Sequence, residues 1–190
     1  MDAGRSFTWM FQQDGWIGKV IIGGLLLLVP IFGWLVVPGY IVKVLSNRVQ
    51  GREELPAWGD WGDLFMKGLI LAVAALIYSL PGAVFSALRI PFLVGLWSLV
   101  TYFVLPAGLL RYVTNGESFG AFFDFSWIIS FIQENIGNYL LAFVLAIVAG
   151  IIAGFGVILF IIGVLFTGFW AYLVIADLYG QAYYLSSSKT

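Results

Sequence analysis

The side chains best placed to do chemistry are carboxylates in two aromatic segments. Asp60 and Asp63 lie in residues 55–65, Leu-Pro-Ala-Trp-Gly-Asp-Trp-Gly-Asp-Leu-Phe, and Asp124 lies in the similar segment 120–127. Acidic groups brought together could bind a cation or a polar headgroup. Acids at the start of a helix more often cap its free N–H groups and complement its positive end. We therefore expect these three aspartates to begin helices rather than to hold a ligand.

Residues of the usual catalytic and metal sites are missing. The chain has no cysteine and no histidine, which excludes thiolate and imidazole ligands, cysteine nucleophiles and Ser-His-Asp triads. One polar cluster could still converge, formed by Arg52, Glu53, Glu54, Asp60 and Asp63. Its mixed charges are typical of a solvated loop. We expect no cofactor, no bound metal and no enzymatic activity.

The composition indicates that lipid is the main solvent of this chain. Of its 190 residues 62% are hydrophobic and only 10% are charged, and the mean hydropathy is +1.01. A soluble domain of this size has too little interior to hide so much apolar surface. The net charge of −1 offers no basic field for phosphates, which argues against a nucleic-acid partner.

Apolar stretches between charged residues predict an all-α, polytopic transmembrane helical bundle. Residues 20–42, 68–88 and 90–110 each have the length of one membrane-spanning helix, whereas 135–176 suffices for two. We expect the last stretch to break in the glycine-rich run 150–156. The prediction is therefore about five spans, with four or six as alternatives, and a kink near Pro30 in the first.

A weak internal repeat organises the single integral membrane domain, residues 1–190. Pro38, Lys43 and Asn47 recur in order and spacing as Pro106, Arg111 and Asn115, each followed by an acidic-aromatic segment and another span. Because each unit would cross the membrane an even number of times, the copies would be parallel. The predicted parts are an N-terminal interfacial segment 1–15, repeat units 16–89 and 90–155, and a last span with a polar tail, 156–190.

Aromatic residues indicate which parts lie at the membrane surface. Trp58 and Trp61 are expected at headgroup depth, because tryptophan prefers that boundary. The aromatic residues of 119–131 recur at spacings of three and four, which is typical of an interfacial amphipathic helix.

Small residues predict where the last helices pack. Two stripes at four-residue spacing let helix backbones approach closely in lipid. Their members are Ala142, Ala146, Gly150 and Gly154 in the first stripe, and Gly163, Thr167 and Ala171 in the second. The stripes pair the last two spans with each other, or else they contact another membrane protein or a second copy.

Four segments together resemble a known family of small polytopic membrane proteins of bacteria and archaea. They are 14–24, 38–40, 55–65 and 176–183. The family is catalogued as domain of unknown function 4013, and Leu-Pro-x-Trp-x-Asp-Trp is its most specific element. The resemblance implies a prokaryotic integral membrane protein with an uncleaved N-terminus. It supplies no activity and no catalytic residue, and Gly15 and Gly59 depart from the expected pattern.

The placement of charges predicts orientation and function. Six basic residues on the side of the two interfacial loops against three on the other, Arg5 and Lys19 among these three, place the loops in the cytoplasm and the N-terminus outside the cell membrane. Every charge lies near a span end, and Asp177 is expected to be interfacial, which disfavours an ion-coupled pump. We expect a structural or interaction protein, an accessory subunit or lipid-associated scaffold. The alternative is a small transporter or channel for an uncharged or amphipathic solute.

Overall fold

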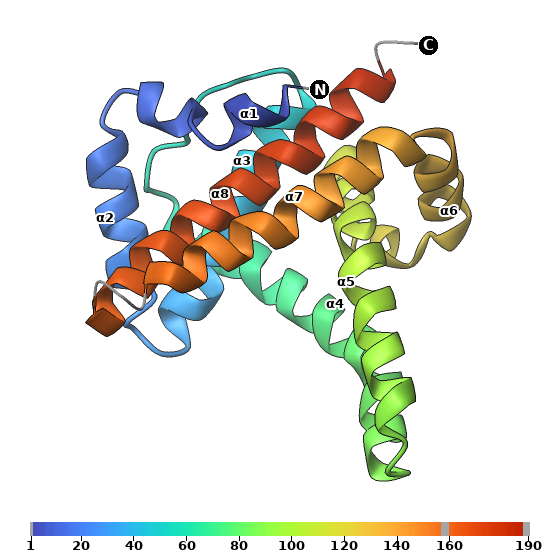
Figure 1. The fold of residues 1–190 in the computed structure, drawn as a ribbon. Coiled ribbons are helices and arrows are strands. Elements are labelled where there is room, and N and C mark those ends of the chain that lie inside the picture. Colours follow the sequence, from blue (N-terminus) through green and yellow to red (C-terminus); the bar gives the residue numbers. More distant parts are fainter. Residues whose placement is uncertain (1, 157–159, 188–190) are drawn as a thin grey trace.

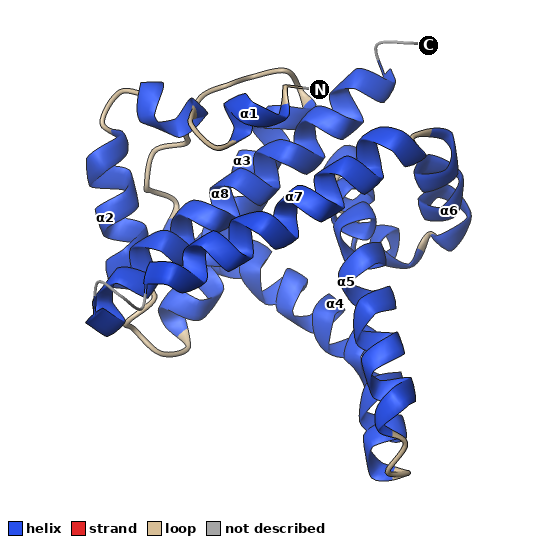
Figure 2. Cartoon of the chain, in the orientation of Figure 1, coloured by secondary structure: helices blue, strands red, loops and turns tan. Residues whose placement is uncertain are grey.

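A computed structural model describes residues 2–156 and 160–187, and within them it contains helices and connecting turns but no strand (Figure 2). The all-α prediction is thereby confirmed. The α-helices are α1 (Ala3–Ser6), α2 (Trp16–Leu26), α3 (Phe32–Val49), α4 (Trp61–Ala87), α5 (Pro91–Thr114), α6 (Phe125–Glu134), α7 (Ile136–Gly154) and α8 (Phe160–Ser187). Two short 3₁₀ helices, η1 (Trp9–Gln12) and η2 (Phe119–Phe123), precede α2 and α6.

Four of the described helices are long and apolar enough to cross a membrane. They are Trp61–Ala87, Pro91–Thr114, Ile136–Gly154 and the Gly163–Ser187 part of α8. The sequence predicted about five spans, with four or six as alternatives, and the structure has four candidates among its described residues. The difference arises in the first apolar stretch, which does not form one long helix.

Residues 20–42 contain a chain reversal instead of the predicted kink. Helix α2 ends at Leu26 and α3 begins at Phe32, with Pro30 between them. Proline cannot donate a helix hydrogen bond, and Ile31 adopts a positive φ of 64°. The Trp34 indole donates to the Leu27 carbonyl (3.1 Å) and so satisfies one of the groups released at the end of α2. The chain therefore doubles back, and α2 and α3 are two separate helices in contact (Figure 1).

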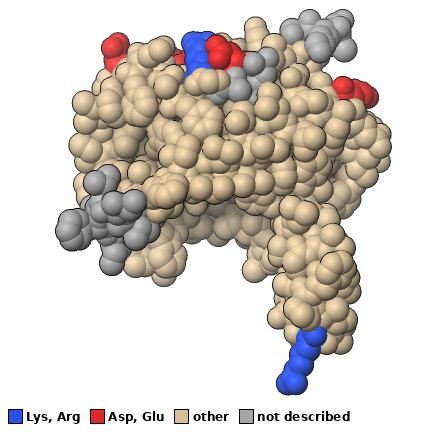
Figure 3. All heavy atoms as spheres, in the orientation of Figure 1, with Lys and Arg blue, Asp and Glu red and all other residues tan. Residues whose placement is uncertain are grey.

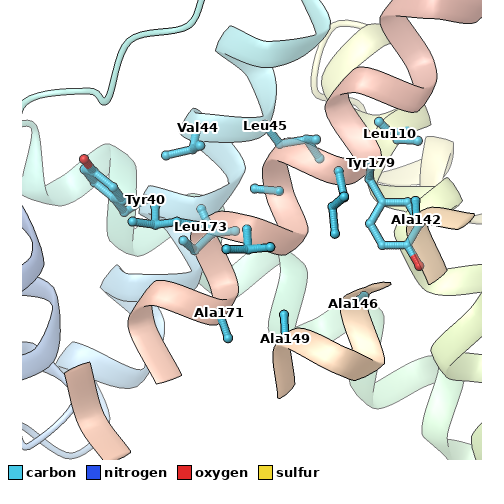
Figure 4. Close-up of a cluster of buried hydrophobic side chains, with 14 of the residues drawn as sticks. Tyr40, Val44, Leu45, Leu110, Ala142, Ala146, Ala149, Ala171, Leu173 and Tyr179 are labelled. Atoms are coloured by element: carbon cyan, nitrogen blue, oxygen red, sulfur yellow. The ribbon is translucent and has the colours of Figure 1, made fainter. Parts of the chain in front are cut away.

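Helix α3 is the buried centre of the molecule. Most of its residues from Val36 to Arg48 are buried, against α4 on one side and α8 on the other. Its crossing with α4 is very close, because a Cβ on Gly39 would lie 1.8 Å from the Leu64 carbonyl oxygen. Gly68 of α4 makes the reciprocal approach to the Leu35 carbonyl. Figure 4 shows Val44 and Leu45 of α3 among the side chains that α5, α7 and α8 bring to the same core.

Helices α7 and α8 pack along each other. This is one of the two arrangements that the small-residue stripes predicted. Ala142 and Ala146 are buried in this contact, but Gly150 and Gly154 are exposed with open space around them. The row continues through two other alanines, Ala149 and Ala153. A step of four residues overshoots a helical turn by about 40°, so a four-residue stripe rotates away from the contact.

The second stripe faces α7. Ala171 is buried, and the Thr167 hydroxyl lies 2.8 Å from the Ala153 carbonyl of α7 and 3.0 Å from the Gly163 carbonyl of its own helix. The break between the helices falls beyond Gly154, where the glycine-rich run was expected to turn. Residues 157–159 of this connection lie outside the described part of the chain.

Helices α4 and α5 form a hairpin whose far end projects from the rest of the molecule (Figure 1). The turn is at Arg89, which has a positive φ of 57°. Large apolar side chains are exposed along both helices, among them Leu76, Leu80, Val84 and Phe92. An apolar hairpin of this length, exposed on several faces, is suited to a hydrocarbon environment and not to water.

Candidate functional site

Asp60 and Asp63 do not converge on a common site. Asp60 precedes α4 in the N-cap position, but its side chain makes no capping hydrogen bond. It is largely exposed and faces the Lys43 ammonium at 3.8 Å. Asp63 is one turn from Lys67, with 3.2 Å between the charged atoms. Each carboxylate is thus already paired with a lysine. In the described part of the chain no group of three or more acidic, histidine or cysteine residues could hold a metal ion.

Asp124 occupies the corresponding place in the second half and does cap a helix. Its carboxylate accepts from the Trp127 backbone N–H at the start of α6 (3.3 Å) and from Arg111 Nε (3.0 Å). The Arg111 guanidinium also lies over the Trp127 ring. Lys43 and Arg111, which the repeat aligns, therefore pair with Asp60 and Asp124, which it also aligns.

The two signature tryptophans are packed against neighbouring elements. The Trp58 ring stacks on Tyr40 of α3 with 4.0 Å between centroids, and Trp61 stacks on Trp58 at 5.9 Å. The Trp58 indole donates to the Lys19 carbonyl of α2 (3.0 Å). Tyr40 in turn donates to the Pro56 carbonyl (2.7 Å). The segment before α4 is thereby held against α2 and α3, which makes its tryptophans part of the fold.

A buried ion pair joins helices α3 and α8. Asp177 of α8 is 0% exposed and Arg48 of α3 is 6% exposed, and Arg48 Nε forms a close ion pair with Asp177 Oδ1. The sequence placed Asp177 at the membrane interface, which stays a prediction, but it did not predict that the carboxylate would be buried against Arg48. Helix α8 continues ten residues beyond it, and the chain folds α3 and an N-terminal segment over its carboxylate. Trp9, which is buried, covers the Arg48 guanidinium from another side.

Polar groups around this pair tie the N-terminal segment to α8. The Gln181 amide donates to Asp177 Oδ2 (2.7 Å) and to the Ser6 hydroxyl (3.0 Å), while its carbonyl accepts from the Asp2 backbone N–H (3.0 Å). Glu53 accepts from both guanidinium nitrogens of Arg5 and lies 3.3 Å from Arg48. The hydrogen bonds from Arg5 hold the pKa of the Glu53 carboxyl below its usual value.

A small polar cavity of about 260 Å³ lies beside this network. The residues that line it are Asp2, Arg5, Arg48, Gly51, Glu53, Gln181, Tyr184 and Leu185. Two arginines and two carboxylates line it, so their formal charges balance and favour neither an anion nor a cation.

Two basic residues, Arg5 and Lys19, lie on the other side of the molecule from the one predicted. Arg5 pairs with Glu53, and Lys19 donates to the Leu55 carbonyl (2.7 Å). Both residues therefore lie beside the first interfacial loop and not across the molecule from it. The cause is the reversal at Pro30, which returns the chain to the side from which it came.

A larger apolar cavity of about 470 Å³ lies where the α4–α5 hairpin leaves the body of the molecule; the space-filling view shows a hollow there (Figure 3). Helices α3, α4, α5, α7 and α8 all contribute to its wall. Pro38 and Pro106, which the repeat aligns, both line it. Its described lining residues are aliphatic apart from three tyrosines, Tyr102, Tyr172 and Tyr179, and none is charged.

Comparison with known proteins identifies the family. One family's sequence profile matches the chain twice, over residues 22–96 and 84–162, which together cover most of its length. The chain belongs to the family described as Protein of unknown function (DUF4013). No curated protein and no solved structure matches it. The two matched ranges overlap at residues 84–96, and the two repeat units remain a prediction.

Membership of the DUF4013 family assigns no activity. What this member binds must therefore be inferred from its own structure. Sequence reasoning missed both the Arg48–Asp177 pair and the apolar cavity. One signal for the pair was present: Asp177 stands in an apolar run with Gln181 one turn later, which is unusual unless the acid has a partner. No comparable signal marks the cavity, because aliphatic side chains look alike in a sequence whether they line a hollow or fill a core.

Proposed function

We propose that the protein is a lipid-associated structural protein of the cell membrane and not an enzyme, and that its apolar cavity holds the hydrocarbon chain of a membrane lipid. The cavity of about 470 Å³ carries the proposal, because helices apolar enough to cross a membrane form most of its wall. Empty space against aliphatic side chains forfeits dispersion contacts, and water there would find few hydrogen-bond partners. Hydrocarbon is the occupant that the surroundings supply.

Charge placement supports an orientation in that membrane. The described basic residues other than Arg89 gather toward one end of the helices: Arg5, Lys19, Lys43, Arg48, Arg52, Lys67 and Arg111. In Figure 3 a basic side chain marks the far tip of the hairpin, where Arg89 forms the turn. By the positive-inside rule the rich end is cytoplasmic. The interfacial loops and the N-terminal segment then share the cytoplasmic side.

The polar groups support a structural role. Four polar residues bond to one another and to the N-terminal segment: Arg48, Asp177, Glu53 and Gln181. Their polar groups are therefore used to hold α3, α8 and the N-terminal segment together. The partners of such a protein are membrane lipid and other membrane proteins, including a second copy of the chain.

Native mass spectrometry of the protein released from mild detergent tests the proposal. We expect the wild type to retain lipid and Ala75→Phe, which fills the cavity from α4, to lose most of it. Ala83→Phe is the matched control, because Ala83 is on the same helix but exposed and away from the cavity. Equal lipid retention by the wild type and both folded variants would overturn the proposal.

The same cavity supports a second candidate, a carrier for an uncharged or amphipathic solute. The observation in its favour is that two in-helix prolines, Pro38 and Pro106, line the cavity, and prolines are sites where helices bend. Solute flux into liposomes that contain only this protein would support the carrier and displace the structural role.

A further inference from the structure

The apolar cavity carries a polar feature that hydrocarbon alone leaves unused. Tyr102 of α5 and Tyr172 of α8 are half-exposed at its wall, and Tyr179 of α8 is only 3% exposed. These three phenols are the polar side chains among the described lining residues. Figure 4 shows the Tyr179 ring projecting from α8 toward α7 near Ala142.

The Tyr179 hydroxyl is buried and has no hydrogen-bond partner among the described residues. Three other buried tyrosines do have a hydrogen-bond partner. Tyr78 donates to the Phe122 carbonyl (2.6 Å), Tyr139 to the Phe103 carbonyl (2.6 Å) and Tyr40 to the Pro56 carbonyl (2.7 Å). Buried hydroxyls are normally paired, so the unpaired hydroxyl of Tyr179, a residue that lines the cavity, is available to an acceptor from outside the chain.

The chemistry of the wall narrows what that partner is. A charged headgroup would lose its hydration there without meeting an opposite charge, since the lining has none. Asp177 does not supply one, because residues two apart point to nearly opposite sides of a helix and its carboxylate is engaged with Arg48. A pure hydrocarbon would leave the phenol unpaired. What remains is an uncharged group with oxygen acceptors.

We infer that the cavity binds a neutral lipid whose small, uncharged head carries oxygen acceptors, with the Tyr179 hydroxyl as its donor and Tyr102 and Tyr172 beside it. This inference rests on the proposed lipid-binding role and names the class of lipid. The hydrocarbon chain lies along the aliphatic wall, and the oxygen-bearing head lies within the helix bundle, below the charged end of the molecule.

Competition binding in detergent micelles tests it with three probes that share long chains. The probes are dioleoylglycerol, which is neutral with oxygen acceptors, dioleoyl phosphatidylglycerol, which is anionic, and squalene, which has no acceptor. We expect the wild type to prefer dioleoylglycerol to both. Tyr179→Phe, which removes only the hydroxyl, should weaken dioleoylglycerol binding by about three- to tenfold, the size of one hydrogen bond, and leave squalene binding unchanged.

Tyr184→Phe is the control, because Tyr184 is on the same helix but lines the polar cavity instead. Tyr102→Phe, at a half-exposed position that a folded protein tolerates, provides a second test of the cavity tyrosines. Preference for phosphatidylglycerol, equal binding of squalene, or no effect of either cavity variant would overturn the inference on lipid class while leaving lipid binding intact. If the wild type bound none of the three probes specifically, the proposed function itself would be overturned.

Discussion

At the scale of single residues, the buried ion pair between Arg48 and Asp177 is the main electrostatic interaction inside the fold. Both side chains are buried, so each charge depends on the other and on Gln181 and Glu53 for the interactions that water would otherwise supply. Burying two charges is costly, and a pair of this kind stabilises a protein little compared with an apolar pair of the same shape. We expect its contribution to be specificity, because the pair joins α3 to α8 and Gln181 ties the N-terminal segment to the same carboxylate.

Removing one partner should therefore be far worse than removing both. We predict that Asp177→Ala lowers the free energy of unfolding by about 3–5 kcal/mol, because it leaves the Arg48 guanidinium buried and unpaired. The double variant Arg48→Leu with Asp177→Leu should regain most of that loss. Thermal unfolding in detergent measures both. Asp60→Asn, in the exposed pair with Lys43, serves as the control and should change stability by less than about 1 kcal/mol. A loss no larger for Asp177→Ala than for Asp60→Asn would contradict the structural role.

The contact between Arg5 and Glu53 should make the N-terminal segment sensitive to acid. The pKa of Glu53 is below its ordinary value of 4.5 in the folded protein. Its contribution is therefore complete above pH 4.5 and is lost as the pH falls through the lowered pKa. We predict that the protection factors of residues 3–12, which compare the observed exchange with the intrinsic rate at the same pH, fall as the pH drops below 4.5. Glu53→Gln should lower these protection factors at neutral pH already, with little further change on acidification. Exchange that is the same in both proteins at neutral pH would rule out this role.

At the scale of elements, close helix crossings decide the architecture. Gly39 and Gly68 let α3 and α4 meet backbone to backbone, a contact that no larger residue permits. We predict that Gly39→Ala destabilises the protein by about 1–3 kcal/mol or more, since the added methyl would meet backbone and not a movable side chain. Gly62→Ala, on α4 in open space, should be neutral or stabilising. Chemical unfolding monitored by tryptophan fluorescence distinguishes them, and equal stability of the two variants would refute the close crossing.

The rotation of α7 provides a second test at this scale. Ala149 is buried against the rest of the fold whereas its neighbour Gly150 is exposed. We predict that Ala149→Leu costs about 1–3 kcal/mol through overpacking, while Gly150→Leu is neutral or stabilising, because the position is exposed and leucine favours a helix more than glycine does. The four-residue stripe requires the opposite order. Melting temperatures of the two variants in one detergent decide between the two faces.

At the scale of the whole molecule, the reversal at Pro30 changes which segments lie together. With four crossing helices, the N-terminal segment and the interfacial loops lie at the same end, and the Arg89 turn lies at the other. The long apolar hairpin, with large hydrophobic side chains exposed along it, fits a chain with helices apolar enough to cross a membrane.

Because the chain has no cysteine, single cysteines can report this topology directly. In intact cells we predict that a membrane-impermeant maleimide labels Leu88→Cys at the hairpin tip, but labels Gln12→Cys and Asn115→Cys only after permeabilisation. All three positions are exposed. External labelling of Gln12→Cys together with protection of Asn115→Cys would restore the five-span arrangement.

Local features of the sequence determined the class of structure, the helical segments after residue 60 and the kinds of chemistry that are excluded. Apolar run length, the glycines near residue 150 and the lack of cysteine and histidine act within a few residues, so they can be interpreted without knowing the fold. Asp124 is a further case, because a cap bonds to a backbone N–H only three residues away.

Only the tertiary structure decided how these parts meet. The partner of Asp177 is on a helix far away in the chain, and Trp9 and Gln181 reach the pair from the two ends of the sequence. Pro30 predicted an interruption, but whether the chain kinks or reverses depends on what α2 and α3 can bury against α8. The rotation of α7 and the unpaired hydroxyl of Tyr179 follow from packing in the same way. Such features depend on which surfaces remain free once several helices have assembled, and spacing along the chain does not encode this.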